Sequence, residues 1–455
     1  MKLLKKKIFI KLAPILDVLP YLMNHYSTDH KLSNIFSFIT NNKINSYNNT
    51  AYIDSFSSFV LSRLSEKGLC PTFPMFYGTF SGISKLFDFD ITEEYNSIKN
   101  CKWFKNKINK EIKKREEKRK GLFLDSESIN SSDCESLKCE ELNIDIDILD
   151  TNNIDDNAEN KETDEENIND DEKNSDNEED SDNKENSDNE EDSEWEDCSE
   201  TSDISINESL SDNLEELDDY KNLYYSQLKN YPVQMNIMEL CDNTLDELIE
   251  RDDYEITSDE WKSILFQVCF GMAVAQKQYN FVHNDLHSSN IMFSNTEKEY
   301  LYIRYKNYYY KIPTFGKITK IIDFGRATFK INDKLFFSDV FKKYGDAEGQ
   351  YCYPYNNSLK KCKILPNKSF DLARLATTIF EYFEEDQELY DLMKSWATDK
   401  YGNCLIYCED DFDLYRNIAK NVFNSIPKDQ LNKKIFRCFR VLREDIPENE
   451  YIYVY

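Results

Sequence analysis

The feature that most limits how this chain can fold is a long acidic segment between Asp125 and Tyr220. Of the 86 acidic and 56 basic residues in the chain, this segment holds 40 Asp or Glu and only 4 Lys, a net charge of −36. Its few apolar side chains cannot offset the entropy lost on ordering, so we expect residues 125–220 to be disordered. The remaining 46 acidic and 52 basic residues give a net charge of +6. The sequence therefore predicts a mildly basic globular body that carries one acidic insertion.

Charge and composition also limit the partners of the chain. The stretch 102–120 is basic, and a charged helical face explains it more simply than a nucleic-acid site does. The acidic insertion is either a solvated tether or a segment that folds back onto the stretch 102–120.

No apolar run reaches the roughly 18 residues of a membrane span, so we expect no membrane contact. The 12 Cys residues lack metal-ligand spacing, which favours reduced thiols in an intracellular, reducing compartment.

Hydrophobic patterns on either side of the insertion predict mixed secondary structure. The apolar residues of 49–67 recur with helical spacing, and Gly68 follows where a helix C-cap needs it. Two prolines mark 69–78 as an edge strand. Further expected strands are 1–12, 233–240, 300–312 and 317–322, and further expected helices are 102–120, 245–249, one that begins at Thr257 or Ser258, and 370–383, with mostly helical structure on to about Arg443.

Three polar residues have the types that phosphoryl transfer from ATP requires. Asp285 and Asn290 are close in sequence, and Asp323 follows in an apolar run that ends in Phe-Gly. One carboxylate can orient the attacking hydroxyl or accept its proton. An amide and a second carboxylate can hold Mg²⁺, which neutralises charge between the β- and γ-phosphates.

These residues lie in two motifs that resemble those of the protein-kinase superfamily. Residues 283–290 read His-Asn-Asp-Leu-His-Ser-Ser-Asn, similar to the family's H-R-D-L-x-x-x-N, and residues 323–325 read Asp-Phe-Gly. The resemblance implies that Asp285 is the catalytic base and that Asn290 and Asp323 bind Mg²⁺. It also implies that ATP is the phosphate donor.

The resemblance extends to residues that would hold the nucleotide. Residues 8–11 read Ile-Phe-Ile-Lys, similar to the family's V-A-I-K, which implies that Lys11 holds the α- and β-phosphates. The run Asn-Ile-Met-Glu-Leu-Cys resembles the strand that leads into the hinge. Met238 would then lie at the back of the adenine pocket, and backbone groups of Glu239 and Cys241 would bond the adenine.

Several positions depart from the family's pattern. No glycine-rich loop precedes Lys11, so we expect a truncated first lobe. Asp54 is the acid best placed on the following helix to pair with this lysine, and it is one methylene shorter than the family's Glu. Asn284 replaces an Arg that pairs with a phosphorylated loop, so we expect activity that does not depend on a phosphate on 326–350. His287 replaces a Lys, as in aminoglycoside and choline phosphotransferases.

The expected fold is α+β, a two-lobed protein-kinase-like fold with a truncated first lobe and a long disordered acidic insertion. The first lobe comprises 1–100 and, with its last strand and the hinge, 224–242. Residues 101–223 form the basic helix and the insertion, and 243–455 form the helical lobe with both motifs.

The expected activity is ATP-dependent phosphorylation of Ser or Thr in a protein substrate. One alternative is a small-molecule phosphotransferase, which His287 favours. Another is a catalytically weak pseudokinase scaffold, which the missing glycine-rich loop favours. The chain most resembles serine/threonine kinases of large DNA viruses of amoebae, which would place it in the host cytoplasm or in the virion.

Overall fold

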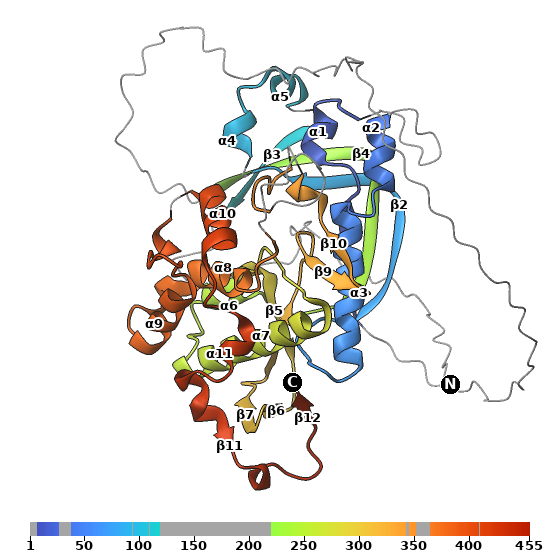
Figure 1. Cartoon of the computed structure of the whole chain (residues 1–455). Coiled ribbons are helices and arrows are strands. Elements are labelled where there is room, and N and C mark those ends of the chain that lie inside the picture. The colour runs from blue at the N-terminus through green and yellow to red at the C-terminus, as the bar shows by residue number, and fades with distance from the viewer. Residues whose placement is uncertain are drawn as a thin grey trace, which may run out of the picture. The chain divides into compact units, whose positions relative to one another are not determined.

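The computed structural model describes residues 7–26, 38–92, 94–108, 110–118, 220–342, 345–351, 365–408 and 410–455. Residues 5–120 and 220–455 belong to one unit, in which a strongly bent antiparallel sheet is followed by a mainly helical body (Figure 1). Residues 125–219 of the expected acidic insertion, and with them the contact of the insertion with 102–120, lie outside the described residues.

The first sheet is built around one long central strand, β4 (Tyr220–Glu239). Strand β2 (Phe76–Asp90) pairs along one edge of β4, and β1 (Ile8–Pro14) and β3 (Ile112–Lys118) pair with opposite ends of its other edge. Helix α3 (Thr50–Glu66) lies beside β2 and β4 (Figure 1). Four short helices complete this part: α1 (Val18–Leu22), α2 (Phe38–Asn45), α4 (Tyr95–Ile98) and α5 (Lys102–Lys107).

The strand register selects which side chains face α3. Lys11 of β1 is opposite Asn236 of β4, which is opposite Thr79 of β2. Opposed residues of antiparallel strands share a face of the sheet, so these three side chains form one polar row. The Thr79 hydroxyl donates to Asn236 Oδ1 at 2.7 Å. The row lies on the α3 side, because Asn236 contacts a carboxylate of that helix.

Helix α7 (Ser258–Tyr279) is the core of the second part. The Thr257 side chain caps it by accepting a hydrogen bond from the Glu260 N–H at 3.3 Å. Nearly all of its residues from Glu260 to Gln276 are buried, so the helix is covered on all sides. The other helices of this part are α6 (Leu245–Ile249), α8 (Phe370–Ile379), α9 (Gln387–Trp396), α10 (Asp411–Asn421) and α11 (Pro427–Gln430).

Short antiparallel pairs of strands in the second part flank the two sequence motifs. Strands β5 (Ile291–Asn295) and β8 (Lys317–Ile321) pair next to the two sequence motifs. Strands β9 (Thr328–Ile331) and β10 (Lys334–Phe337) form a hairpin directly after the second motif. The remaining strands are β6 (Tyr300–Tyr305), β7 (Tyr308–Pro313), β11 (Arg440–Val441) and β12 (Ile452–Val454), which form one sheet.

Two of the expected elements are wrong in part. The strand expected at 69–78 begins only at Phe76, because the residues before it form a connection that buries Phe73 in the main core. The helix expected at 102–120 is helical only over Lys102–Lys107, and β3 follows it. Ile112 is fully buried and pairs with Ser226, so pairing with β4 overrides the local helix propensity.

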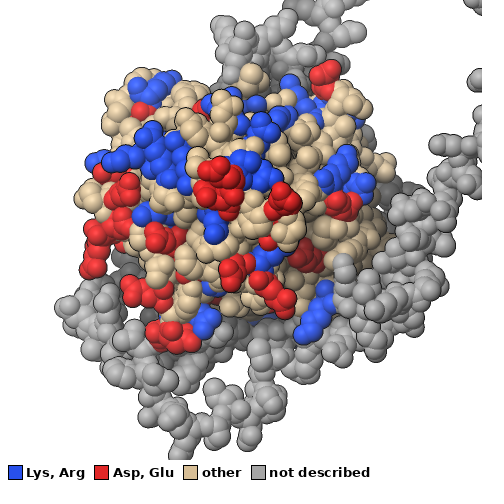
Figure 2. Space-filling view, turned by 90° about the horizontal axis from the view of Figure 1, so that it is seen from below, with Lys and Arg blue, Asp and Glu red and all other residues tan. Residues whose placement is uncertain are grey.

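The outer surface carries charges of both signs. Figure 2 shows Lys and Arg side chains gathered in a band across the upper part of the view, with Asp and Glu side chains between and below them. In the described part of the chain, no helix is both long enough and apolar enough to cross a membrane.

Close packing between α7 and the connection after α3 gives a prediction for stability. A Cβ atom at Gly271 would lie 2.6 Å from Cβ of the buried Thr72. We expect Gly271→Ala to lower the free energy of unfolding by about 1–3 kcal/mol, although Ala is the better helix former by about 1 kcal/mol. Urea denaturation followed by circular dichroism measures the change.

Gly82→Ala is the control, because a Cβ there meets no heavy atom within 4 Å. It should leave the stability close to that of the unsubstituted protein. A stabilised Gly271→Ala protein would contradict the packing described here.

Candidate active site

Lys11 is the centre of an ion-pair network that joins the two parts of the chain. Its Nζ lies 3.0 Å from Asp54 Oδ2 and 2.9 Å from Asp323 Oδ1. Strand β1 supplies the lysine, α3 supplies Asp54, and the segment after β8 supplies Asp323. Asp54 is one methylene shorter than Glu, but it still reaches the lysine.

The carboxylate of Asp54 is buried and has three partners. Besides Lys11, it accepts a hydrogen bond from Asn236 Nδ2 at 3.2 Å and one from the backbone N–H of Phe324 at 2.9 Å. Its side chain is only 3% exposed. One carboxylate thus fixes β1, β4 and the Asp-Phe-Gly backbone against α3.

The network favours the charged forms of Lys11 and Asp323. Burial lowers the pKa of Lys11, but the two carboxylates outweigh burial, so its pKa is raised. Burial raises the pKa of the Asp323 carboxyl. The opposing effect of Lys11 is larger, so the pKa is lowered to about 2. The Asp323 side chain is still 48% exposed, so its carboxylate can also face a cation.

The backbone of 323–325 is held by packing as well as by charge. Asp323 has a φ of +61°, an uncommon conformation for a residue with a Cβ. The ring of Phe324 is buried, and its centroid lies 5.5 Å from that of His283. A Cβ on Gly325 would come within 3.2 Å of Thr50 Cγ2, at the start of α3. The motif and the helix therefore fit closely against each other.

Asp371 of α8 holds the backbone that leads to Asp285. Its carboxylate accepts hydrogen bonds from the N–H groups of His283 at 3.1 Å and Asn284 at 2.9 Å. Burial raises the pKa of Asp371 to about 7. His283 Nε2 lies 2.8 Å from the carbonyl of Ile322, to which a ring N–H can donate. The two motifs are thus linked directly.

The carboxylate of Asp285 has a partner at each oxygen. Oδ1 accepts a hydrogen bond from the hydroxyl of Tyr415 in α10, and Oδ2 lies 3.6 Å from Nε of Arg326. The side chain is 23% exposed, so an acceptor hydroxyl can reach it. The sequence analysis identified neither partner. Tyr415 lies 130 residues away, and only the position of Arg326 next to the Asp-Phe-Gly motif could have indicated it.

Asn290, the last residue of the first motif, contacts residues on both sides of the site. Its Nδ2 donates to the carbonyl of Asp285 at 2.9 Å and lies 3.0 Å from Nε2 of His287. Burial lowers the pKa of His287, which favours the neutral ring that can accept this bond. The Asn290 carbonyl accepts from the N–H of Ile322 at 3.1 Å, next to Asp323. The amide oxygen Oδ1 is then the atom suited to a cation.

Asp323 and Asn290 fit a Mg²⁺ ion by their chemistry. They offer carboxylate and amide oxygens, the ligand type of a hard cation that takes its other ligands from phosphates and water. Across the residues that the structure describes, no cluster of three or more His, Cys, Asp or Glu forms a protein-only metal site. A cation bound by these two residues would therefore share its coordination with a phosphate ligand.

Met238, Glu239 and Cys241 lie where β4 ends and the connection to α6 begins. The side chains of Met238 and Cys241 are buried. Burial raises the pKa of the Glu239 carboxyl, but Lys320, at 3.1 Å, lowers it more, so its pKa is lowered. The backbone N–H of Glu239 donates to the carbonyl of Met75 at 2.8 Å. The N–H of Glu239 is therefore already used within the protein.

A second polar cluster ties the segment after β10 to the start of α3. The buried carboxylate of Asp339 accepts a hydrogen bond from the N–H of Thr50 at 3.0 Å and lies 2.8 Å from Lys43 Nζ. Lys43 also lies 2.7 Å from Asp17. A negative charge at a helix N-terminus is favourable, so this cluster stabilises α3 where it meets the Asp-Phe-Gly motif.

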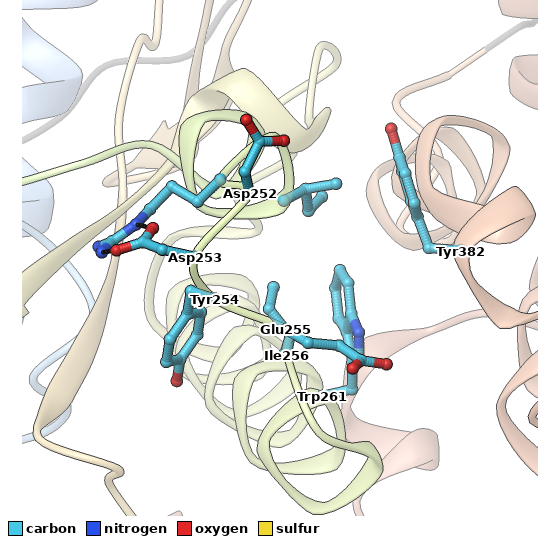
Figure 3. Close-up of a pocket in the computed structure, with 9 residues that line it drawn as sticks. Asp252, Asp253, Tyr254, Glu255, Ile256, Trp261 and Tyr382 are labelled. Carbon is cyan, nitrogen blue, oxygen red and sulfur yellow. Dashed lines mark hydrogen bonds and ion pairs between the residues drawn. The ribbon is translucent and has the colours of Figure 1, made fainter. Parts of the chain in front are cut away.

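A separate pocket of about 530 Å³ lies between the α6–α7 connection and the short helical turn 380–383 (Figure 3). Trp261 and Tyr382 contribute aromatic rings to it, and Asp252 and Glu255 contribute carboxylates. No residue expected at the phosphotransfer site lines this pocket.

Comparison with known proteins gives sequence relatives but no family profile that matches. A Dictyostelium discoideum protein named as a serine/threonine-protein kinase is 30% identical over 132 residues, which cover 27% of this chain and 11% of that protein. A mimivirus protein named in the same way is 29% identical over 212 residues, 41% of this chain and 51% of that protein. The Arabidopsis thaliana haspin homolog, also named as a serine/threonine-protein kinase, is 35% identical over 82 residues, 18% of this chain and 14% of that protein.

These alignments are partial. The chain spans between about a tenth and about half of the length of these relatives. A solved structure of the yeast RNA polymerase II CTD kinase complex is 23% identical and covers 22% of this chain and 26% of that chain. Its TM-score of 0.16 is too low for a comparison of folds.

The partners of Asp54 lead to a prediction for stability. We expect Asp54→Ala to lower the free energy of unfolding by about 3 kcal/mol, because it leaves the N–H of Phe324 and the amide of Asn236 without an acceptor. Asp54→Asn keeps a carbonyl oxygen for the N–H of Phe324, so its loss should be smaller. Urea titrations of both proteins measure the difference, and equal losses would contradict the role given to this hydrogen bond.

Proposed function

We propose that this chain, a divergent relative of the serine/threonine protein kinases, is an ATP-dependent kinase of atypical type that phosphorylates Ser or Thr in proteins. The observation that carries the proposal is the network in which Lys11 joins Asp54 to Asp323, next to Asp285 and Asn290. A cation for phosphates, a carboxylate for a hydroxyl and two oxygen ligands for a metal are thereby brought together. The names of the relatives favour a protein as the acceptor.

In this proposal each residue has one task. Asp285 orients the acceptor hydroxyl and accepts its proton as the phosphoryl group is transferred. Lys11 holds the α- and β-phosphates, and Asp54 keeps its amine in place. Asn290 and Asp323 would hold Mg²⁺, which neutralises charge between the β- and γ-phosphates when it is bound. Met238 and the backbone of Glu239 and Cys241 would line the adenine site.

A small alcohol is the second candidate acceptor, and His287 is the observation that favours it. His287 stands beside Asn290 with a neutral ring, in a place where protein kinases carry a lysine. Parallel assays with basic proteins and with small alcohols such as choline and aminoglycosides distinguish the two acceptors.

Transfer of radiolabelled phosphate from ATP tests the proposal. We expect Asp285→Asn to reduce turnover by about 10²- to 10⁴-fold, because the proton acceptor is lost. It should keep the thermal stabilisation that Mg²⁺ and ATP give, because Asp285 is assigned no contact with the nucleotide. Asp323→Ala should lose both turnover and the part of this stabilisation that depends on Mg²⁺. Wild-type turnover in Asp285→Asn would refute the assignment, and nucleotide binding without any transfer by the wild type would indicate a scaffold.

Activity without loop phosphorylation is the second expectation of this proposal. Asn284, which replaces the expected Arg, donates to the carbonyl of Arg326 at 2.8 Å and accepts from the hydroxyl of Tyr351 at 2.6 Å. Asp339 is bound to Thr50 and Lys43. These neutral and ionic contacts hold the segment after the Asp-Phe-Gly motif.

We therefore expect phosphatase treatment to leave the rate of phosphate transfer unchanged. Intact-protein mass spectrometry verifies that no phosphate remains on 326–350. A rate that collapses after this treatment, and returns when the segment is phosphorylated again, would show that the expectation is wrong.

A further inference from the structure

We infer that Arg326 is the cation that stabilises the phosphoryl group during transfer, and that Tyr415 positions both Arg326 and Asp285 for this step. The inference rests on the proposed kinase activity and adds two residues to its machinery. Neither belongs to a motif that the sequence analysis used.

Arg326 lies next to the carboxylate of Asp285. It follows Gly325 directly, and its Nε lies 3.6 Å from Oδ2 of Asp285. Its backbone carbonyl accepts the hydrogen bond from Asn284 at 2.8 Å, so the residue is fixed to the catalytic loop. Arg326 therefore lies beside the carboxylate that would receive the proton, three residues after the Asp323 that would hold the metal.

The guanidinium of Arg326 is held by the ring of Tyr415. Its carbon lies 5.5 Å from the centroid of the Tyr415 ring, within the range of a cation–π contact. The hydroxyl of the same Tyr415 donates to Oδ1 of Asp285. One tyrosine thus supports the arginine with its ring and the carboxylate with its hydroxyl. Because Tyr415 lies in α10, it fixes the positions of both groups from outside the two motifs.

The Arg326 guanidinium is held only loosely by Asp285 and can change its direction. A charge-assisted hydrogen bond from a guanidinium to a carboxylate is about 2.7–2.9 Å long, so the 3.6 Å separation is a looser contact. The Arg326 side chain is 30% exposed. The guanidinium can therefore turn from Asp285 toward a phosphate that enters beside it, and its planar array of N–H groups suits phosphate oxygens.

The phosphoryl group in transfer also needs a positive charge. Lys11 is already paired with two carboxylates. His287 is half-buried, and its Nε2 already faces the amide of Asn290 at 3.0 Å. In the part of the chain that the structure describes, Arg326 is the Lys or Arg that lies within 4 Å of Asp285. Charge that develops on the transferred group needs such a cation, and removal of one comparable donor from an active site costs about 10²- to 10³-fold in turnover.

The test is steady-state phosphate transfer by the full chain carrying Arg326→Met, Arg326→Lys or Tyr415→Phe. We expect Arg326→Met to lower kcat by at least about 100-fold with little change in KM for ATP, and Arg326→Lys to recover part of the loss. Tyr415→Phe keeps the ring and removes the hydroxyl, so it should lower kcat by a smaller factor, about tenfold.

Arg374→Met is the matched control. The guanidinium carbon of Arg374 lies 5.0 Å from the centroid of the same Tyr415 ring, but Arg374 is not the residue that lies within ion-pair distance of Asp285. Its kcat should stay close to that of the wild type. A control that loses as much kcat as Arg326→Met would overturn the inference, because any guanidinium on the ring would then matter equally.

A second readout is the binding of Mg²⁺·ADP with aluminium fluoride, which resembles a phosphoryl group in transfer. Arg326→Met should weaken this complex far more than it weakens Mg²⁺·ADP alone. If the wild type transfers phosphate and Arg326→Met keeps its kcat, this inference fails while the proposed function stands. If the wild type neither binds Mg²⁺·ATP nor transfers phosphate, the proposed function fails and the inference fails with it.

Discussion

One lysine shared by two carboxylates is the interaction on which the rest of the site depends. Lys11 lies about 3 Å from both Asp54 and Asp323, and these three residues come from a strand, a helix and the Asp-Phe-Gly motif. A buried carboxylate requires nearly all of its hydrogen-bonding capacity to be used, and Asp54 meets that requirement with Asn236 and Phe324. The position of α3 relative to the central strand and to the motif follows from satisfying this one buried charge.

A second buried carboxylate holds the segment that leads to Asp285. Asp371 receives two backbone N–H groups, and burial raises its pKa to about 7. His283 then connects the loop to the carbonyl of Ile322, so the segments before Asp285 and before Asp323 are held as one piece. Lys11, Asp285 and Asp323 remain partly exposed, whereas the carboxylates of Asp54 and Asp371, which hold the segments around them, are buried. This division is expected of a site whose geometry is fixed before a substrate arrives.

Much of this arrangement could be anticipated from short-range patterns. The long helix from Ser258, its cap at Thr257 and the helix at 50–66 follow from apolar periodicity and cap residues, which are local properties of the chain. The strand at Ile112–Lys118 could not be anticipated in this way. Its partner residues in β4 lie beyond the acidic segment, and pairing across more than a hundred residues leaves no local signal.

By itself, the sequence determined the types of the residues proposed for chemistry and their order along the chain. The motifs at 283–290 and 323–325 are visible as residue types at short spacings, and Lys11 is visible as the end of the run Ile-Phe-Ile-Lys. Only the tertiary structure decided which acid meets the lysine, which groups hold Asp285 and what secures the segment after the second motif. Asp54, Tyr415 and Asp339 act through contacts with residues remote in sequence. Such contacts are selected by packing and by the cost of leaving a buried charge unpaired, neither of which is written in any local pattern.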